Sequence, residues 1–306
     1  EEYYAENYPG EYKEELEYFY NYVISSDSKE RTAHQICLSL RSKNLTKEEI
    51  ASLKKGIAHY GLFYPKQYRV KKENTFEDFI NILQEYEVRK GTFGIDERLD
   101  QKGFTLYMSC NPSSDLAVAN AIGSAYNESS KEAFLAFTTK KDPQQAVNNA
   151  MSLPYRVGHL FTSKGCTEDK FVHLDFDFRD DLKEDESATK EAGSVIINCG
   201  NILFGKENLL VIRTKNGIHV IIKESAYGKA AKYILSLDKD EAEAEYGLEN
   251  GPNPTTCFIY AVEENYSYTF QEPEKGHTYQ QNQCFVPIPG VYQYGDFEVK
   301  ILNKIQ

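Results

Sequence analysis

Residues 171–178, which read Phe-Val-His-Leu-Asp-Phe-Asp-Phe, restrict what this chain can fold into more than any other stretch. Apolar and polar residues alternate there, and a period of two is typical of a β-strand whose successive side chains point to opposite faces. One face would carry Val172, Leu174, Phe176 and Phe178, and the other His173, Asp175 and Asp177. Two neighbouring carboxylates repel each other unless a cation lies between them, so Asp175 and Asp177 are candidate ligands for Mg2+ or Mn2+. The alternative is an edge strand with one wet face.

Length and composition indicate a globular, water-soluble class. The chain has 306 residues, which fits two domains or one domain with an appendage. No apolar run approaches the roughly 18 residues that cross a bilayer, so we expect no membrane partner. The six cysteines lie far apart without a C-x-x-C pair, which favours a reducing cytoplasm over a disulfide framework or a zinc ribbon.

The charge distribution is uneven. A formal net charge of -12 argues against a protein that coats nucleic acid. Residues 41–72, however, carry nine Lys or Arg against two Glu. This basic stretch is either a contact for a phosphate backbone, and hence for a template, or a solvated helix face.

The first 90 residues are predicted to form a helical accessory unit. Apolar residues recur at helical spacing in 1–24 and in 75–89, and further helices are expected over 29–42 and 46–61. Thr46 and Glu49 form a capping box at the start of the third helix.

Residues 91–306 are predicted to form a second unit, which makes the fold class α+β. A linker runs to Gly103, a strand covers 104–110, and an Asn-Pro turn leads into a helix over 115–125 capped by Ser113 or Ser114. The turn either holds an anion or is only a turn. Residues 129–151 are expected to be helical in two pieces divided at Pro143.

Residues 208–223 are predicted to form a β-hairpin. Two β-branched runs flank Asn216-Gly217, a dipeptide that suits a type I′ turn. That turn pairs Thr214 with His219 on a polar face, with Arg213 and Lys215 nearby. The group is either a clamp for phosphate oxygens or an ordinary exposed histidine beside a turn.

Together, the two stretches resemble motifs I and II of the archaeo-eukaryotic primase superfamily, the primase-polymerases. The matching residues are Asp175 and Asp177 in an h-x-h-D-h-D strand, then residues 214–220 in a hairpin of the form [ST]-x-x-G-x-H-h. Residues 285–292 look like the h-P-G-T turn near the end of these catalytic domains, with Val291 where Thr is usual.

The resemblance implies a primase-polymerase-like core with an RRM-like β-sheet in residues 91–306. Asp175 and Asp177 would hold Mg2+ or Mn2+, and His219 would contact the phosphates of a nucleoside triphosphate. The nucleotide-binding residues would be Arg213, Thr214, Lys215, Asn216 and Gly217. The activity implied is two-metal nucleotidyl transfer onto a strand paired with a DNA or RNA template, in DNA replication or repair. No Walker A motif is present in this sequence, so a helicase would act in trans.

The sequence departs from the family pattern in one place. The family supplies a third carboxylate before the P-G-T-like turn, but residues 276–288 contain no Asp or Glu, and neither Asp238 nor Asp296 fits the pattern. Two alternatives therefore stay open: an inactive primase-like protein of a mobile element that binds nucleic acid or a partner, and a metal-dependent nuclease. The spacing of His159, Cys166 and His173 matches no zinc-finger pattern.

Overall fold

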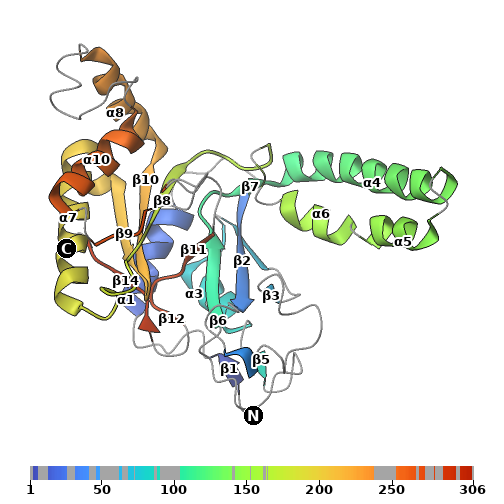
Figure 1. The fold of residues 1–306 in the computed structure, drawn as a ribbon, viewed down its shortest axis with the longest axis horizontal. Helices are drawn as coiled ribbons and strands as arrows, with labels where there is room; N and C mark the ends of the chain where they lie inside the picture. Colours follow the sequence, from blue (N-terminus) through green and yellow to red (C-terminus); the bar gives the residue numbers. More distant parts are fainter. Residues whose placement is uncertain are drawn as a thin grey trace.

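A computed structural model shows a mixed α+β fold, as the sequence predicts (Figure 1). It describes residues 3–5, 13–25, 32–40, 46–48, 62–63, 68–71, 73–85, 88–89, 104–139, 142–151, 153–160, 163, 165–237, 253–266, 269–272, 279, 285–293 and 297–304. Among these residues no helix is long and apolar enough to cross a membrane.

One antiparallel sheet carries the residues of greatest interest. Its strands lie in the order β14 (Lys300–Ile301), β9 (Leu209–Arg213), β10 (Gly217–Lys223) and β8 (Phe171–Asp177). Helix α7 (Glu186–Phe204), followed by the short η4 (Lys206–Asn208), connects β8 to β9, and α8 (Glu224–Ser236) follows β10. The succession β-α-β-β-α, with the first strand paired to the third, matches the first five elements of an RRM-like sheet.

The other edge of β8 is bonded to a later part of the chain. The amide of Asp175 donates to the carbonyl of Tyr279 at 2.8 Å, and the amide of Gln271 donates to the carbonyl of Asp177 at 2.8 Å. Phe178 and Phe270 form an isolated antiparallel bridge. These bonds satisfy backbone groups that an edge strand would leave exposed, so β8 has neighbours on both sides.

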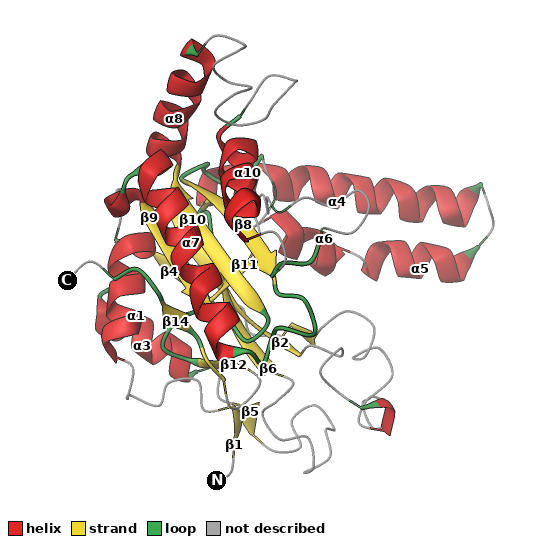
Figure 2. Ribbon diagram, turned by 60° about the vertical axis from the view of Figure 1, so that its left-hand side comes forward, coloured by secondary structure: helices red, strands yellow, loops and turns green. Residues whose placement is uncertain are grey.

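A second sheet packs beside the first (Figure 2). It has the order β11 (Phe285–Pro287), β6 (Phe104–Ser109), β2 (Thr32–Leu40) and β3 (Leu62–Phe63), with β4 (Tyr68–Lys71) and β7 (Ser113–Ser114) also paired to β2. The strand predicted over 104–110 is confirmed. The helix predicted over 29–42 is wrong, because residues 32–40 form the central strand β2.

The N-terminal segment is therefore not a separate helical unit. Helix α1 (Lys13–Phe19) continues into the π-helix η1 (Tyr20–Ile24), and α3 (Phe76–Gln84) begins at a capping box of Thr75 and Asp78. These helices fall within the predicted ones, although 3–5 and 88–89 form the paired strands β1 (Tyr3–Ala5) and β5 (Val88–Arg89). Most of the helix predicted over 46–61, and all of 91–103, lie outside the described residues.

Two apolar clusters form the core, one on each face of the β8 sheet. The first joins α1, η1 and α3 to both sheets and includes Phe171, Ile212 and Ile221. The second packs Leu174, Phe176 and other residues of the opposite face against α7, α8 and α10 (Pro254–Tyr266). The alternation predicted for 171–178 is thus the one observed.

Three helices project from the body of the molecule as an arm (Figure 1). Helix α4 (Asp115–Thr138) begins at Ser114, whose hydroxyl accepts from the amide of Ala117, and it is followed by α5 (Pro143–Met151) and α6 (Leu153–Leu160). The break at Pro143 and the Ser114 cap are confirmed, but α4 runs thirteen residues past the predicted end at 125. Near the C-terminus, β12 (Tyr292–Gln293) pairs with β13 (Phe297–Glu298).

Candidate functional site

The pairing of β8 with β10 brings together the residues that the sequence singled out. Asp175 lies directly opposite His219, and Asp177 lies opposite Gly217. Directly paired residues of an antiparallel ladder share a face, so Asp175, Asp177 and His219 belong to one face of the sheet. Nε2 of His219 is 3.5 Å from Oδ1 of Asp175. This face is the one that looks toward the second sheet.

The hairpin between β9 and β10 is confirmed, but its turn differs from the predicted one. His219 pairs with Ile212, not with Thr214, and Ile218 pairs with Arg213. The amide of Thr214 donates to the carbonyl of Gly217 at 2.9 Å, so Lys215 and Asn216 form the two-residue tip. The shift is by two residues along β9, an even number, so each side chain keeps its predicted face.

Gly217 is required for a different reason from the one predicted. Its φ is not among the positive values, which the described glycines show only at Gly205 and Gly290. A Cβ at Gly217 would instead lie 2.1 Å from the backbone oxygen of Phe176 on the neighbouring strand. The glycine therefore permits the close approach of β10 to β8 beside Asp177.

His173 lies beside His219 and fixes its orientation. Nε2 of His173 lies 2.8 Å from Nδ1 of His219, and the two rings are nearly parallel, with an angle of 15° between their planes and centroids 5.1 Å apart. His173 is fully enclosed, and burial, followed by the neighbouring His219, holds its pKa well below the usual value, so it is neutral.

The histidine pair fixes which ring nitrogen of His219 carries a proton. Nδ1 of His173 is buried with no hydrogen-bond partner among the described residues, so a proton there would be an unsatisfied donor. We therefore assign the proton of His173 to Nε2, which donates to Nδ1 of His219. His219 then carries its own proton on Nε2, the nitrogen that faces Asp175.

Asn111 anchors the start of β8 to the end of β6. Its side-chain amide donates to the carbonyl of Phe171 at 2.9 Å, and its Oδ1 accepts from the amides of Lys170 and Phe171, both at 2.9 Å. The Asn-Pro turn is therefore a clamp between the two sheets. These three bonds fix the position of the strand that carries Asp175 and Asp177.

The other predicted nucleotide-binding residues are placed differently. The guanidinium of Arg213 packs over the ring of Phe178 at 4.5 Å, and Arg213 pairs with Ile218 on the helix-covered face, away from His219. Burial lowers the pKa of Arg213 to about 10. The hydroxyl of Thr214 donates to the carbonyl of Gly217 at 3.1 Å and closes the turn. Lys215 and Asn216 are half-exposed at the hairpin tip.

The basic stretch over 41–72 is described only in part. Arg69 forms an ion pair with Asp115 at the start of α4, and Nζ of Lys71 lies 3.8 Å from the same carboxylate. These two cations therefore stabilise the base of the arm. Residues 41–45, 49–61, 64–67 and 72, which carry most of the other positive charges, lie outside the described residues.

The P-G-T-like segment is a turn that connects the two sheets. Gly290 has a φ of 81°, a conformation that favours glycine, and its amide donates to the carbonyl of Val299 at 2.9 Å. The chain leaves the second sheet at β11 and enters the first at β14.

The donor set at Asp175 and Asp177 is compatible with a hard divalent cation. The side chain of Asp175 is 27% exposed and Asp177 is exposed, so water and a ligand can reach both. Within the described ranges, no group of three or more His, Cys, Asp or Glu side chains is arranged to hold a metal ion. Asp238, Asp296 and the side chain of His159 lie outside the described residues, so the trio His159, Cys166 and His173 stays a sequence observation.

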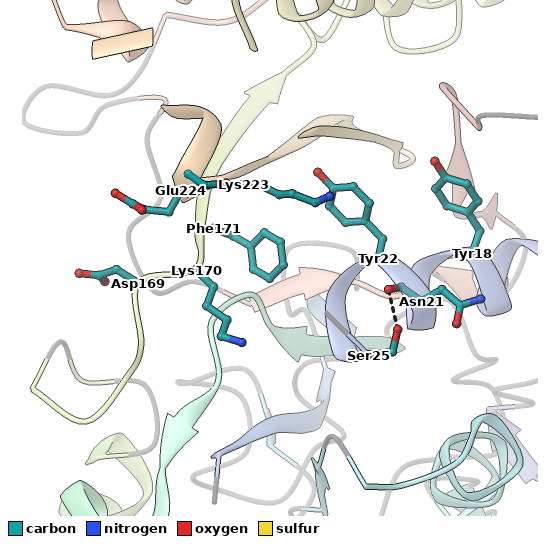
Figure 3. Close-up of a pocket in the computed structure, with 10 residues that line it drawn as sticks. Tyr18, Asn21, Tyr22, Ser25, Asp169, Lys170, Phe171, Lys223 and Glu224 are labelled. Carbon is teal, nitrogen blue, oxygen red and sulfur yellow. Dashed lines mark hydrogen bonds between the residues drawn. The ribbon is translucent and has the colours of Figure 1, made fainter. Parts of the chain in front are cut away.

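A cavity of about 730 Å3 opens at the other end of β8, between η1 and the start of α8 (Figure 3). Phe171 in its wall is four residues, or roughly 13 Å, from Asp175 along the strand. Two lysines, Lys170 and Lys223, face two acids, Asp169 and Glu224, so the wall has no excess charge. The cavity is separate from the Asp175 site.

No protein-family model, curated protein or solved structure matches this chain.

Sequence reasoning missed two residues of the site, His173 as a partner of His219 and Asn111 as the clamp of β8. His173 had a signal, because the alternation in 171–178 already places it on the face of Asp175. Asn111 had none, since its bonds join segments 59 and 60 residues apart.

Proposed function

We propose that this chain is a primase-polymerase-like nucleotidyltransferase that adds nucleotides to a nucleic-acid strand in DNA replication or repair. The observation that carries the proposal is the 3.5 Å approach of His219 to Asp175 across the β8–β10 ladder, with Asp177 on the same face. The order of elements around this ladder is further support, because it is the RRM-like order that the family resemblance implies.

Asp175 and Asp177 would hold Mg2+ or Mn2+ between the two carboxylates and the phosphates of a nucleoside triphosphate. Two protein carboxylates suffice, because Mg2+ is commonly bound by one or two of them together with waters and substrate phosphates. When bound, the metal neutralises negative charge on the phosphates and on the attacking oxygen.

The chain's own residues position the triphosphate. Nε2 of His219 carries a proton and faces the carboxylate side of the site, so it can donate to a phosphate oxygen that a cation holds against Asp175. His173 keeps His219 in this tautomer, and the hydrogen bond between the two nearly parallel rings fixes the plane of the His219 ring. Asn111 and Gly217 hold the two strands in register, so the three functional side chains stay aligned.

The test is extension of a labelled primer on a DNA template with Mn2+ and nucleoside triphosphates. We expect Asp175→Asn and Asp177→Asn to abolish extension, and His219→Ala to lower it by about two orders of magnitude, the usual effect of a lost transition-state donor. Asp181→Asn is the matched control. Asp181 is exposed on the loop after β8 and pairs with Arg179, so its loss should leave extension unchanged. Equal extension by wild type and Asp175→Asn would contradict the proposal.

The second candidate is a member that binds nucleotide or nucleic acid without catalysis. It is favoured by the lack, among the described residues, of a third acid beside Asp175 and Asp177. Nucleotide binding that needs Asp175, without any extension, would identify this case. Shortening of the labelled strand would instead identify the metal-dependent nuclease.

A further inference from the structure

Helices α4 and α5 of the arm bury little of their own apolar surface. The buried residues of α4 form a single seam, Val118, Ala125, Ser129 and Ala136, on the face that α5 and α6 cover. None of the residues of α5 is buried. Arg156 of α6 pairs with Glu128 and Glu132 of α4, so polar contacts also hold the arm together.

Exposed apolar side chains are concentrated on this arm. Eight of the eleven large apolar side chains that are exposed among the described residues lie on α4 and α5: Leu116, Ile122, Tyr126, Phe134, Leu135, Phe137, Val147 and Met151. Exposed apolar residues scattered singly are ordinary, but a concentration on one element indicates a surface that another molecule covers.

The exposed side of α4 has the spacing of a helix-packing seam. Seven residues follow one another at intervals of three and four, and all are exposed or half-exposed: Leu116, Ala119, Gly123, Tyr126, Ser130, Ala133 and Phe137. We name these residues the outer seam. Alternating intervals of three and four place side chains along one line, on which a second helix can pack with knobs in holes.

Gly123 lies in the middle of the outer seam, where contacts within the arm do not require a glycine. Glycine weakens the interior of a helix, and a Cβ at Gly123 would meet no atom within 4 Å. Space within the chain therefore does not require it. A small residue in the middle of an exposed seam is expected where another helix backbone approaches closely.

We propose that the outer seam binds the outer seam of a second copy of this chain, with the two α4 helices antiparallel about a two-fold axis. In the register that places the two-fold axis beside Tyr126, at the middle of the seam, Leu116 lies opposite Phe137 of the second copy, Gly123 lies opposite Ser130, and the two Tyr126 side chains meet near the axis. Such an interface is isologous, because each copy offers the same patch.

The balanced charge of the arm suits contact with a second copy of the chain better than contact with nucleic acid. Residues 115–160 carry four acids and four bases, whereas the whole chain has a net charge of -12. Two copies of the chain repel each other because both are negatively charged. The two arms have no net charge, so they can approach without this repulsion. The arm also lacks the excess of Lys and Arg that binding to phosphates draws on.

The size and shape of the arm fit a dimer. Tyr126 and Phe137 of the outer seam are 58% and 63% exposed, and together they present on the order of 250 Å2. That is about a third of the roughly 800 Å2 that each partner buries in a standard interface, and the other five residues of the seam add to it. Helix α4 has 24 residues and is about 36 Å long, so antiparallel arms place the two cores at opposite ends.

Light scattering of the full chain after size-exclusion chromatography tests the proposal. We expect the wild type to have twice the monomer mass, and Phe137→Glu to have the monomer mass at the same concentration. Tyr233→Glu is the matched control. Tyr233 is an aromatic residue of α8 that is 52% exposed, so this change should leave the dimer intact.

Two further variants separate the interface from folding and test its register. Gly123→Leu favours the helix itself but fills the close contact, so we expect a monomer whose far-UV circular dichroism is native and whose thermal stability is equal or higher. Leu116→Lys should also give a monomer, and combining it with Phe137→Glu should restore the dimer mass. A wild type that is monomeric at all concentrations, or a Gly123→Leu variant that stays dimeric, would overturn the proposal.

Discussion

Gly217→Ala tests how closely β8 and β10 approach at the site. The added Cβ would lie 2.1 Å from the backbone oxygen of Phe176, and 3.0 Å from Cα of Asp177. An ordinary contact begins at 3.4 Å, so the two groups would have to separate by about 1.3 Å, and the obstacle is a backbone group that cannot rotate away. Overpacking of this kind costs about 1–3 kcal/mol, and the lost flexibility of the unfolded chain returns about 0.4–1 kcal/mol. We expect a net loss of about 1–2 kcal/mol.

The assay is urea denaturation, followed by circular dichroism, of Gly217→Ala beside Gly228→Ala. Gly228 lies within α8, and its Cβ would be 3.7 Å from the carboxylate of Glu224, an ordinary contact. This control should gain about 0.5–1 kcal/mol, because alanine favours a helix over glycine. The reasoning would be refuted if Gly217→Ala were as stable as the wild type.

Three further predictions concern stability. Asn111→Ala removes three bonds that hold β8, and the free energy of unfolding in urea should fall by about 2–4 kcal/mol; a loss below about 0.5 kcal/mol would refute the clamp. Burial lowers the pKa of His34 to about 4, below the roughly 6.5 of an unfolded histidine. Between these values only the unfolded state takes up the proton, so stability should fall by up to roughly 3 kcal/mol as the pH drops from 6.5 to 4. His34→Gln should flatten this pH dependence, and an unchanged slope would contradict it. Glu15→Ala removes the carboxylate that accepts from the amide of Ile301 and pairs with Lys304, so it should cost about 1–3 kcal/mol in the same denaturation assay; a variant as stable as the wild type would refute that contact.

The strands with a clear alternation could be predicted from the sequence, and the central strand of the second sheet could not. Apolar and polar residues alternate in 171–178 because one face of β8 is covered by helices and the other looks toward the second sheet. Each side chain lies on the face that the sequence predicts. In β2, residues 32–37 are buried without alternation. Nδ1 of His34 is bonded to the carbonyl of Ser109, and the backbone amide of Gln35 donates to the Ser109 hydroxyl. A strand enclosed on both faces has no period of two, so the alternation that marks β8 as a strand is absent from β2.

The family motif predicted which candidate residues lie together better than the rules for the hairpin turn did. Position 219 is 44 residues from position 175, and only the long-range pairing of β8 with β10 brings His219 beside Asp175. The hairpin residues show the limit of local rules. Asn216-Gly217 suggests a type I′ turn, but the glycine is needed because β10 lies close to β8. The hydroxyl of Thr214 closes the turn, and Arg213 packs over Phe178 on the helix-covered face.

The most direct test of the account is a crystal grown with Mn2+ and a non-hydrolysable nucleoside triphosphate, measured for anomalous scattering from manganese. We predict a peak about 2.0–2.3 Å from carboxylate oxygens of both Asp175 and Asp177, with a phosphate oxygen within hydrogen-bond distance of Nε2 of His219. A peak bound elsewhere, or a triphosphate that leaves His219 untouched, would contradict the proposed site.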